Sequence, residues 1–180
     1  GAAYYIPKVK SESDQYRGNS VSVTLAMGSK RQAEQIAALF KAGGAKAVVT
    51  EAGLKVTGDL SKILENCLAD ADAMYHNNGE EVAGKYGYDE RQVLYNWWKA
   101  FKEMNRDLKK QKKFEEAKVV DLVVKKAVES SYNYYRIEPQ RIGNRLGTVI
   151  LSLAFYVMYT LWYGFSIMFI FEGLGMKLGH

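Results

Sequence analysis

The chain is poor in cysteine, histidine and proline, and each shortage excludes a class of structure or site. Its 180 residues contain one cysteine, Cys67, so no disulfide can form within the chain. The two histidines, His76 and His180, are too far apart in sequence to form a ligand-spaced metal pair. The only prolines are Pro7 and Pro139, which leaves the residues between them free for helices.

Motifs for chemistry are also missing from the sequence. No glycine-rich phosphate loop, nucleophile elbow or haem-attachment motif occurs in the chain. Cys67 lies between Leu64 and Leu68 in an apolar stripe, so we expect a buried core thiol. Four acidic residues without calcium-loop spacing are expected to form a solvated face: Asp70, Asp72, Glu80 and Glu81. We therefore predict no metal, no cofactor and no enzymatic activity.

Charge is absent from one long stretch. Residues 146–171 form a run of 26 residues without a charged side chain. A helix rises about 1.5 Å per residue and the hydrocarbon core of a bilayer is about 30 Å thick, so about 20 apolar residues cross it. We expect a single C-terminal transmembrane helix at residues 146–171, after a basic juxtamembrane linker at 136–145 and before a short tail at 172–180.

Hydroxyl side chains follow one side of this expected membrane helix. Ser152, Tyr156, Tyr159, Tyr163 and Ser166 are spaced by 4, 3, 4 and 3 residues. Tyrosine is usual at membrane surfaces, whereas these three tyrosines fall near the middle of the span. A hydroxyl that faces lipid has no solvent partner and is usually turned towards another helix. The stripe predicts a helix that packs on partner helices, although bonds back to its own helix are the alternative.

Residues 20–76 have the pattern of a small α+β unit. Alternation of apolar and polar residues predicts strands, and apolar spacing of three and four residues predicts helices. The expected elements are, in order, a strand at 21–25, a helix capped by Ser29 and Gln32, strands at 47–50 and 54–57, and a helix capped by Asp59. The expected order is therefore β-α-β-β-α.

The segments directly before and after this α+β unit are expected to be irregular. The residues after the second of these segments are expected to be helical. Residues 1–19 show no usable period and predict an extended N-terminal arm, and the polar residues 77–88 predict a connector. Residues 89–135 predict a helical segment that begins after Asp89. It is either a helical hairpin that breaks near Gln111, which we favour, or one long helix with a fault there. Its first half carries an aromatic face that we expect to be buried: Trp97, Trp98 and Phe101.

A basic cluster interrupts the helical segment. It consists of Arg106, Lys109, Lys110, Lys112 and Lys113. Its simplest interpretation is a solvated helix end, where cations suit the helix dipole. Because the domain is expected to be tethered to a bilayer, anionic lipid headgroups or an acidic partner subunit are the alternatives. Nucleic acid is not expected, because the aromatic residues near the cluster are predicted to be buried.

The stretch from Val21 to Asp70 resembles the peptidoglycan-binding SPOR domain. The resemblance rests on a strand, the pair Gly28-Ser29, a helix that ends at Gly43-Gly44, a strand pair and a second helix. It covers less than a third of the chain, and the closing strand of that domain is not evident in the sequence. The resemblance implies a binding module on the exported side of the membrane.

These patterns favour a non-catalytic accessory or assembly subunit of a multisubunit membrane complex, in which other membrane subunits are the partners. The alternative is a free-standing tethered binding module, either SPOR-like or specific for anionic lipid. Basic residues are more frequent before the uncharged run than after it: Arg136, Arg141 and Arg145 precede it, and Lys177 follows it. The positive-inside rule then predicts a single-pass protein whose soluble domain is cytoplasmic, or in the mitochondrial matrix.

Overall fold

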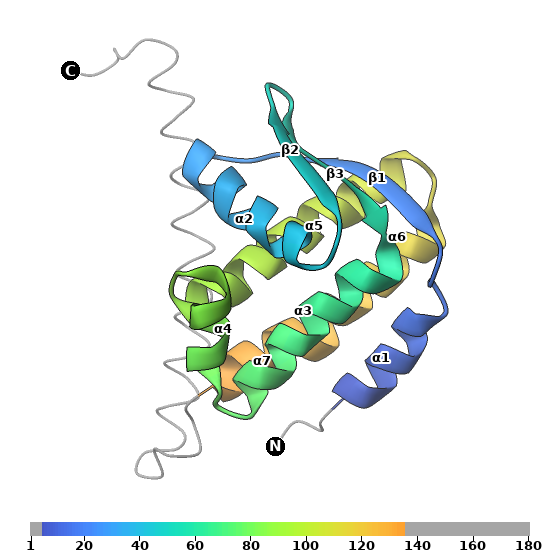
Figure 1. Cartoon of the computed structure of the whole chain (residues 1–180). Coiled ribbons are helices and arrows are strands. Elements are labelled where there is room, and N and C mark those ends of the chain that lie inside the picture. The colour runs from blue at the N-terminus through green and yellow to red at the C-terminus, as the bar shows by residue number, and fades with distance from the viewer. Residues whose placement is uncertain (1–4, 136–180) are drawn as a thin grey trace, which may run out of the picture.

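The computed structural model describes residues 5–135 (Figure 1). The expected linker at 136–145, membrane helix at 146–171 and tail at 172–180 lie outside the described residues. The hydroxyl stripe lies outside them too: Ser152, Tyr156, Tyr159, Tyr163 and Ser166. Among residues 5–135, no helix combines the length and the apolar character that a membrane crossing requires.

The described residues form a mixed α+β fold around a small three-stranded sheet, as the sequence pattern predicts (Figure 1). The β-α-β-β-α order of residues 20–76 is confirmed. Its elements are β1 (Ser20–Leu25), α2 (Lys30–Ala42), β2 (Lys46–Thr50), β3 (Gly53–Asp59) and α3 (Leu60–Tyr75). In the described chain α3 is followed by a helix, so the closing strand of a SPOR-like unit does not appear at that place.

Side-chain caps fix where three helices begin. The Ser29 hydroxyl accepts a hydrogen bond from the backbone N–H of Gln32 at 3.1 Å, which starts α2. Asp59 and Asp89 cap α3 and α5 in the same way, each at 3.3 Å. Such a cap satisfies one of the four backbone donors that a helix start leaves free and stabilises the helix by about 1 kcal/mol. These starts were predictable because the capping residues precede clear apolar periods.

The sheet has one core face and one solvent face. Its order is β1-β3-β2, and both pairings are antiparallel. The core face is apolar and is covered by helices, with α2 and α3 packed on it. On the solvent face, Thr24 of β1 and Val48 of β2 lie on either side of Lys55 of β3. The solvent face therefore combines hydroxyl and lysine side chains with one exposed valine.

The two edges of the sheet differ. At the edge formed by β1, the Asp107 carboxylate accepts a hydrogen bond from the Thr24 backbone N–H at 3.0 Å. The Gln111 amide donates to the Ser22 carbonyl at 2.8 Å, so side chains from the end of α5 occupy this edge. Within the described chain, β2 has β3 as its one partner strand, and its outer edge is open.

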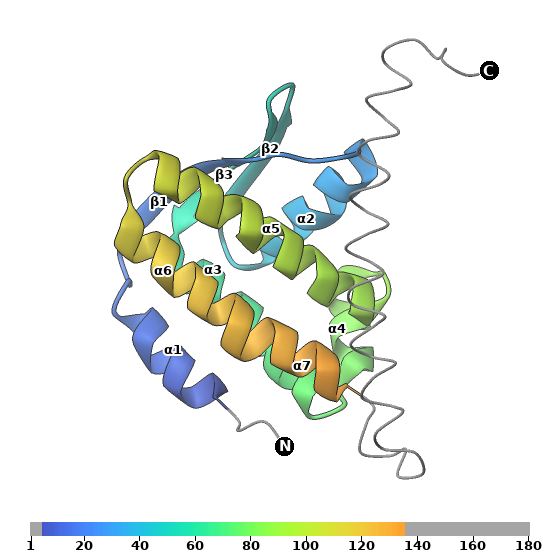
Figure 2. The same ribbon diagram turned by 180° about the vertical axis from the view of Figure 1, so that it is seen from behind.

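The helical segment is a hairpin, as predicted. The first arm is α5 (Glu90–Lys110), which ends at Gln111. The second arm runs back along α5 as a continuous rod (Figure 2). It consists of α6 (Phe114–Val123), a π-helical turn (Val124–Val128) and α7 (Glu129–Tyr134). The aromatic face of α5 is buried as expected, with Trp97 and Phe101 fully covered and Trp98 7% exposed.

The π-helical turn keeps the second arm in contact with the core along its whole length. Before the turn, Ala117 and Val120 are buried, and after it Ala127, Tyr132 and Tyr135 are buried. A π turn takes up one more residue per turn than an α-helix does, so it rotates the side chains that follow it. Both halves of the rod therefore present apolar side chains to the same core.

Two segments that were expected to be irregular are helices. The predicted extended arm contains α1 (Ile6–Asp14), and the predicted polar connector contains α4 (Gly79–Tyr86). Both predictions were wrong for the same reason. Each helix is short and has few apolar residues, and packing on the rest of the molecule stabilises it. In α1 the buried apolar residues are Ile6 and Val9, and in α4 it is Val82.

Cys67 lies in the core, as the sequence predicts. Its side chain is fully buried in α3. Burial raises the pKa of the thiol well above its usual value, and the nearby Asp70 carboxylate adds to this shift. A thiol with a raised pKa and no exposure is a poor nucleophile.

We therefore expect Cys67 to react slowly with a maleimide in the native protein and rapidly after unfolding in denaturant. Mass spectrometry of timed samples measures both rates. Cys67→Ala should lower the free energy of unfolding by roughly 1 kcal/mol, because it removes a small buried side chain from the core. Rapid labelling under native conditions would contradict the buried position.

Candidate functional site

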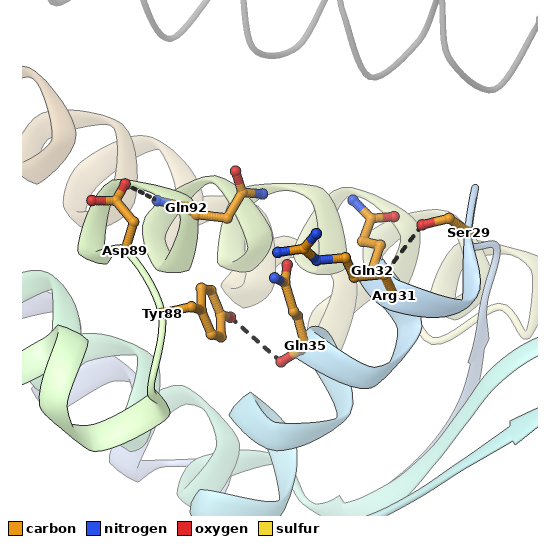
Figure 3. A pocket seen from close by; sticks show the side chains of 7 residues that line it. All are labelled: Ser29, Arg31, Gln32, Gln35, Tyr88, Asp89 and Gln92. Atoms are coloured by element: carbon orange, nitrogen blue, oxygen red, sulfur yellow. Dashed lines mark hydrogen bonds between the residues drawn. The ribbon is translucent and has the colours of Figure 1, made fainter.

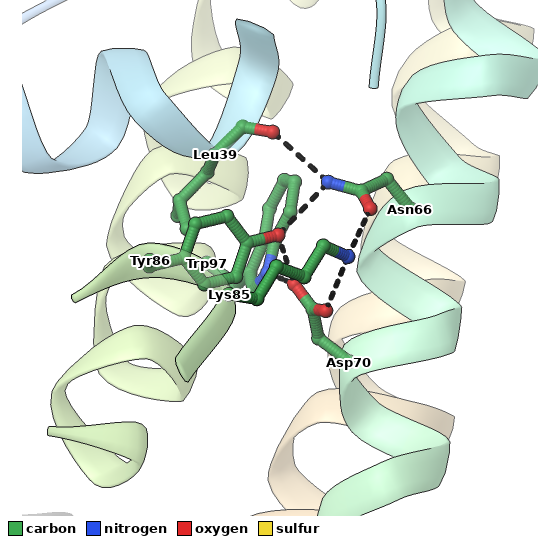
Figure 4. A network of polar contacts seen from close by, with 6 residues as sticks. All are labelled: Leu39, Asn66, Asp70, Lys85, Tyr86 and Trp97. Carbon is green, nitrogen blue, oxygen red and sulfur yellow. Dashed lines mark hydrogen bonds and ion pairs between the residues drawn. The ribbon is translucent and has the colours of Figure 1, made fainter. Parts of the chain in front are cut away.

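The most concentrated polar chemistry in the described residues surrounds a buried carboxylate, Asp70. The residue is 2% exposed. One carboxylate oxygen accepts from the Lys85 ammonium at 2.8 Å. The other accepts from the Tyr86 hydroxyl at 2.5 Å and from the Trp97 indole N–H at 2.8 Å (Figure 4). Three donors on three side chains therefore compensate the loss of water around this charge.

Three helices bring the members of this network together. Asp70 lies on α3, Lys85 and Tyr86 form the last turn of α4, and Trp97 lies on α5. Asn66, one turn before Asp70 on α3, extends the network. Its amide nitrogen donates to the Tyr86 hydroxyl and to the Leu39 carbonyl of α2, both at 3.0 Å. The network therefore joins four helices at one point.

The arrangement is suited to holding helices rather than to transferring protons. Burial raises the pKa of the Tyr86 hydroxyl far above its usual value, and the Asp70 charge raises it further. The Lys85 ammonium also contacts the Asn66 carbonyl oxygen at 2.6 Å and lies over the Tyr86 ring. Every polar group at the centre of this network has a partner within it. We interpret the network as a structural connection.

The prediction of a solvated acidic face was wrong for one of its four members. Asp70 is buried, while Glu80 and Glu81 are exposed as expected. Asp72 is half-exposed and lies 3.3 Å from the His76 ring nitrogen. The signal that identifies Asp70 is its position three residues after Cys67, on the apolar stripe of α3. No comparable pattern in the sequence identifies its partners on α4, Lys85 and Tyr86.

A second polar hollow lies between the first turns of α2 and α5. Seven residues line it: Ser29, Arg31, Gln32, Gln35, Tyr88, Asp89 and Gln92 (Figure 3). The Asn96 amide donates to the Gln35 side-chain oxygen and to the Tyr88 hydroxyl, each at 3.0 Å. Burial raises the pKa of Tyr88 to about 12, so this hydroxyl is neutral at physiological pH. One arginine and one aspartate at the hollow give it no net preference for anions or cations.

The structure places the basic cluster at the turn between α5 and α6. Lys109, Lys110 and Lys112 are exposed and Lys113 is half-buried. Arg106 pairs with Glu103 at 3.5 Å. The cluster lies beside the closed edge of the sheet, because Asp107 and Gln111 bind β1 from the same turns.

Metal-ligating side chains do not gather in the described part of the chain. Among residues 5–135, no group of three or more His, Cys, Asp and Glu side chains is arranged to hold a metal ion. Comparisons with known proteins add no assignment, because no family model, no curated protein and no solved structure matches this chain.

The Asp70 network should contribute strongly to stability. Asp70→Asn places an amide N–H₂ among three donors and leaves buried donors unpaired, so we expect a loss of about 2–4 kcal/mol in the free energy of unfolding. Urea unfolding of the full chain in mild detergent, followed by tryptophan fluorescence, measures the change. The matched control is Asp72→Asn, a half-exposed residue on the same helix, which should change it by less than about 0.5 kcal/mol. If Asp70→Asn changes the free energy of unfolding as little as Asp72→Asn does, the network is dispensable for stability.

Proposed function

We propose that the chain is a non-catalytic accessory or assembly subunit of a multisubunit membrane complex. The observation that carries the proposal is the uncharged run at 146–171 with its hydroxyl stripe. A plain tether needs only Leu, Ile and Val, whereas mid-span tyrosines need partners for their hydroxyl groups. Interhelical hydrogen bonds in membranes contribute about 0.6 to 2 kcal/mol each, so several on one side favour docking on neighbouring helices.

The domain at residues 5–135 supports a binding and positioning role. Its most polar buried group, Asp70, is used to join helices. Its exposed features are the open edge of β2, the hydroxyl-and-lysine face of the sheet and the basic cluster. Such features suit contact with other proteins. The domain therefore fits a subunit that covers or connects larger partners.

A tethered binding module that acts alone is the second candidate, and the basic cluster favours it if anionic lipid is the ligand. The two candidates differ in size after extraction. A complex subunit migrates with one large assembly in blue-native electrophoresis, whereas a free-standing module migrates alone or as a small homo-oligomer.

The hydroxyl stripe gives a direct test of the proposed docking. Replacing Tyr156, Tyr159 and Tyr163 with Leu should leave membrane insertion intact, because Leu inserts at least as favourably. The variant should still be released from the complex, because the hydroxyl contacts and the ring shapes on that side are lost. Co-migration with the large assembly in mild detergent measures the release.

The matched control replaces Leu161 and Phe169, which fall on other sides of the expected helix, with Ala and Leu. This variant should remain in the complex. Equal retention of both variants would reduce residues 146–171 to a plain tether, and the proposed function would be wrong.

The orientation of the domain is a separate proposal. We propose the cytoplasmic or matrix side, because basic residues are more frequent before the uncharged run than after it. Protease added to sealed vesicles should digest the domain when that side faces outwards and leave it intact when it faces inwards. Digestion from the exported side alone would reverse the assignment.

A further inference from the structure

Lysine side chains lie on the solvent face of the sheet and beyond its closed edge. Two exposed lysines lie on the solvent face of the sheet: Lys46 on β2 and Lys55 on β3. The cluster lies beyond β1 on the same sheet, where Asp107 and Gln111 attach the end of α5. Together they make a surface that we name the basic face: Lys46, Lys55, Lys109, Lys110, Lys112 and Lys113. Among residues 5–135, none of these six lysines forms an ion pair.

Nearby acidic groups offset only part of the charge of this face. The Asp107 carboxylate is held by Thr24 and by the Gln111 amide. Glu115 and Glu116 follow in the next turn, and the Glu116 carboxylate accepts a hydrogen bond at 3.1 Å from Asn19, the residue before β1. The chain has a net charge of +5, and the basic face concentrates part of it on one side of the domain. Such a field attracts an acidic partner.

The open edge of β2 lies on the opposite side of the sheet from the cluster. The two most exposed valines of the domain lie on this strand, with Val48 58% exposed and Val49 47% exposed. They point to opposite faces of the sheet, because side chains alternate along a strand. A strand added beside β2 would have Lys46 and Val48 as neighbours on the solvent face, and Ala47 and Val49 on the core face. That pattern suits a partner strand with acidic residues on one side and apolar residues on the other.

The position of the basic face separates it from the membrane side of the domain. The rod formed by α6, the π turn and α7 runs from the basic cluster to Tyr135 (Figure 2). At about 1.5 Å per residue, its 21 residues from Phe114 to Tyr134 separate the two ends by roughly 30 Å. Under the proposed function the expected linker at 136–145 joins this end of the rod to the membrane. Charges this far apart are screened, since the Debye length is about 8 Å at physiological ionic strength.

The end of the domain at Tyr135 carries charges of both signs, and the Arg91 guanidinium lies over the Tyr135 ring. Its hydroxyl donates to the Glu90 carboxylate at 2.5 Å, and Glu80 and Glu81 lie beside it. The basic cluster lies at the other end of the rod, roughly 30 Å from headgroups that meet this end. Pairing of β2 with β2 of a second copy is also unfavourable, because it brings Lys46 and Lys55 of both copies onto one face. The remaining occupant is a segment of another protein.

We propose that the basic face and the open edge of β2 bind an extended acidic segment of a partner subunit, which adds a fourth strand to the sheet. The segment alternates acidic and apolar residues. The acidic residues lie beside Lys46, with Lys55 one strand further into the sheet, and the apolar residues cover Val49. Backbone hydrogen bonds to β2 supply affinity, and the lysines select the charge of the partner. This inference rests on the proposed function, because it takes the membrane attachment after Tyr135 from it.

The test uses the full chain in nanodiscs of zwitterionic lipid and a fluorescent probe peptide of alternating Glu and Val. Fluorescence anisotropy should show saturable binding that weakens with salt, and the matching Lys–Val peptide should not bind. K46E/K55E should weaken binding about tenfold or more, because like charges across an interface oppose association. The control K8E/K10E makes the same change in net charge on α1 and should leave binding unchanged. Equal weakening by both variants would overturn the proposal.

Backbone pairing is tested with two probes N-methylated at alternate residues, one at each Val and the other at each Glu. Only one of these sets of N–H groups faces β2, so one probe should fail and the other should bind. Equal binding of both would show simple charge attraction and would overturn the added strand.

The bilayer alternative is tested by repeating the titration in nanodiscs that contain phosphatidylglycerol. Unchanged binding at physiological salt supports the proposal, and loss of binding would assign the basic face to the lipid surface and overturn it. The variant with Tyr156, Tyr159 and Tyr163 replaced by Leu should bind the probe normally, because its changes lie outside the sheet. If the probe does not bind the unmodified protein while the triple variant is still released from its complex, the added strand is wrong and the proposed function stands.

Discussion

The fold depends on one buried carboxylate. Asp70 lies among apolar side chains of α3, where an uncompensated charge would cost several kcal/mol. The cost is offset only when α4 places Lys85 and Tyr86, and α5 places Trp97, around its two oxygens. An eight-residue helix such as α4 is marginal in water when isolated, so its contacts with Asp70 and the core decide its position. A single charge thus couples the sheet-bearing unit to the helical hairpin.

The regular parts of this fold could be predicted from the sequence because local signals agree there. Capping residues precede α2, α3 and α5, strand alternation is regular in β1, and polar residues near Gln111 end α5. The two short helices could not be predicted, because long-range packing supplies their stability. In α4, Gly79 is the clearest example, since a Cβ at this position would overlap the ring of Tyr135, more than 50 residues away in sequence.

The candidate sites, like the helices and strands, could be predicted from the sequence only in part. The basic cluster is visible as a run in the sequence, and burial of the neighbouring aromatic residues was correctly expected. That Lys46 and Lys55 share the solvent face of the sheet depends on strand register, which places Lys55 between Thr24 and Val48. No pattern in the sequence states which edge of a sheet is closed. Two side chains near the end of α5, Asp107 and Gln111, make that difference.

The π-helical turn at Val124–Val128 has a consequence for how the chain leaves the domain. Each residue of an α-helix turns the chain by about 100°, so loss of one residue from this turn would rotate everything after it by that angle. Tyr132 and Tyr135 would then leave the core, and the exit direction at residue 135 would swing around the rod. The turn therefore fixes the angle at which Tyr132 and Tyr135 meet the core, and with it the direction of the backbone at residue 135. An insertion or a deletion in this turn would therefore destabilise the domain even if the new sequence kept the same apolar composition.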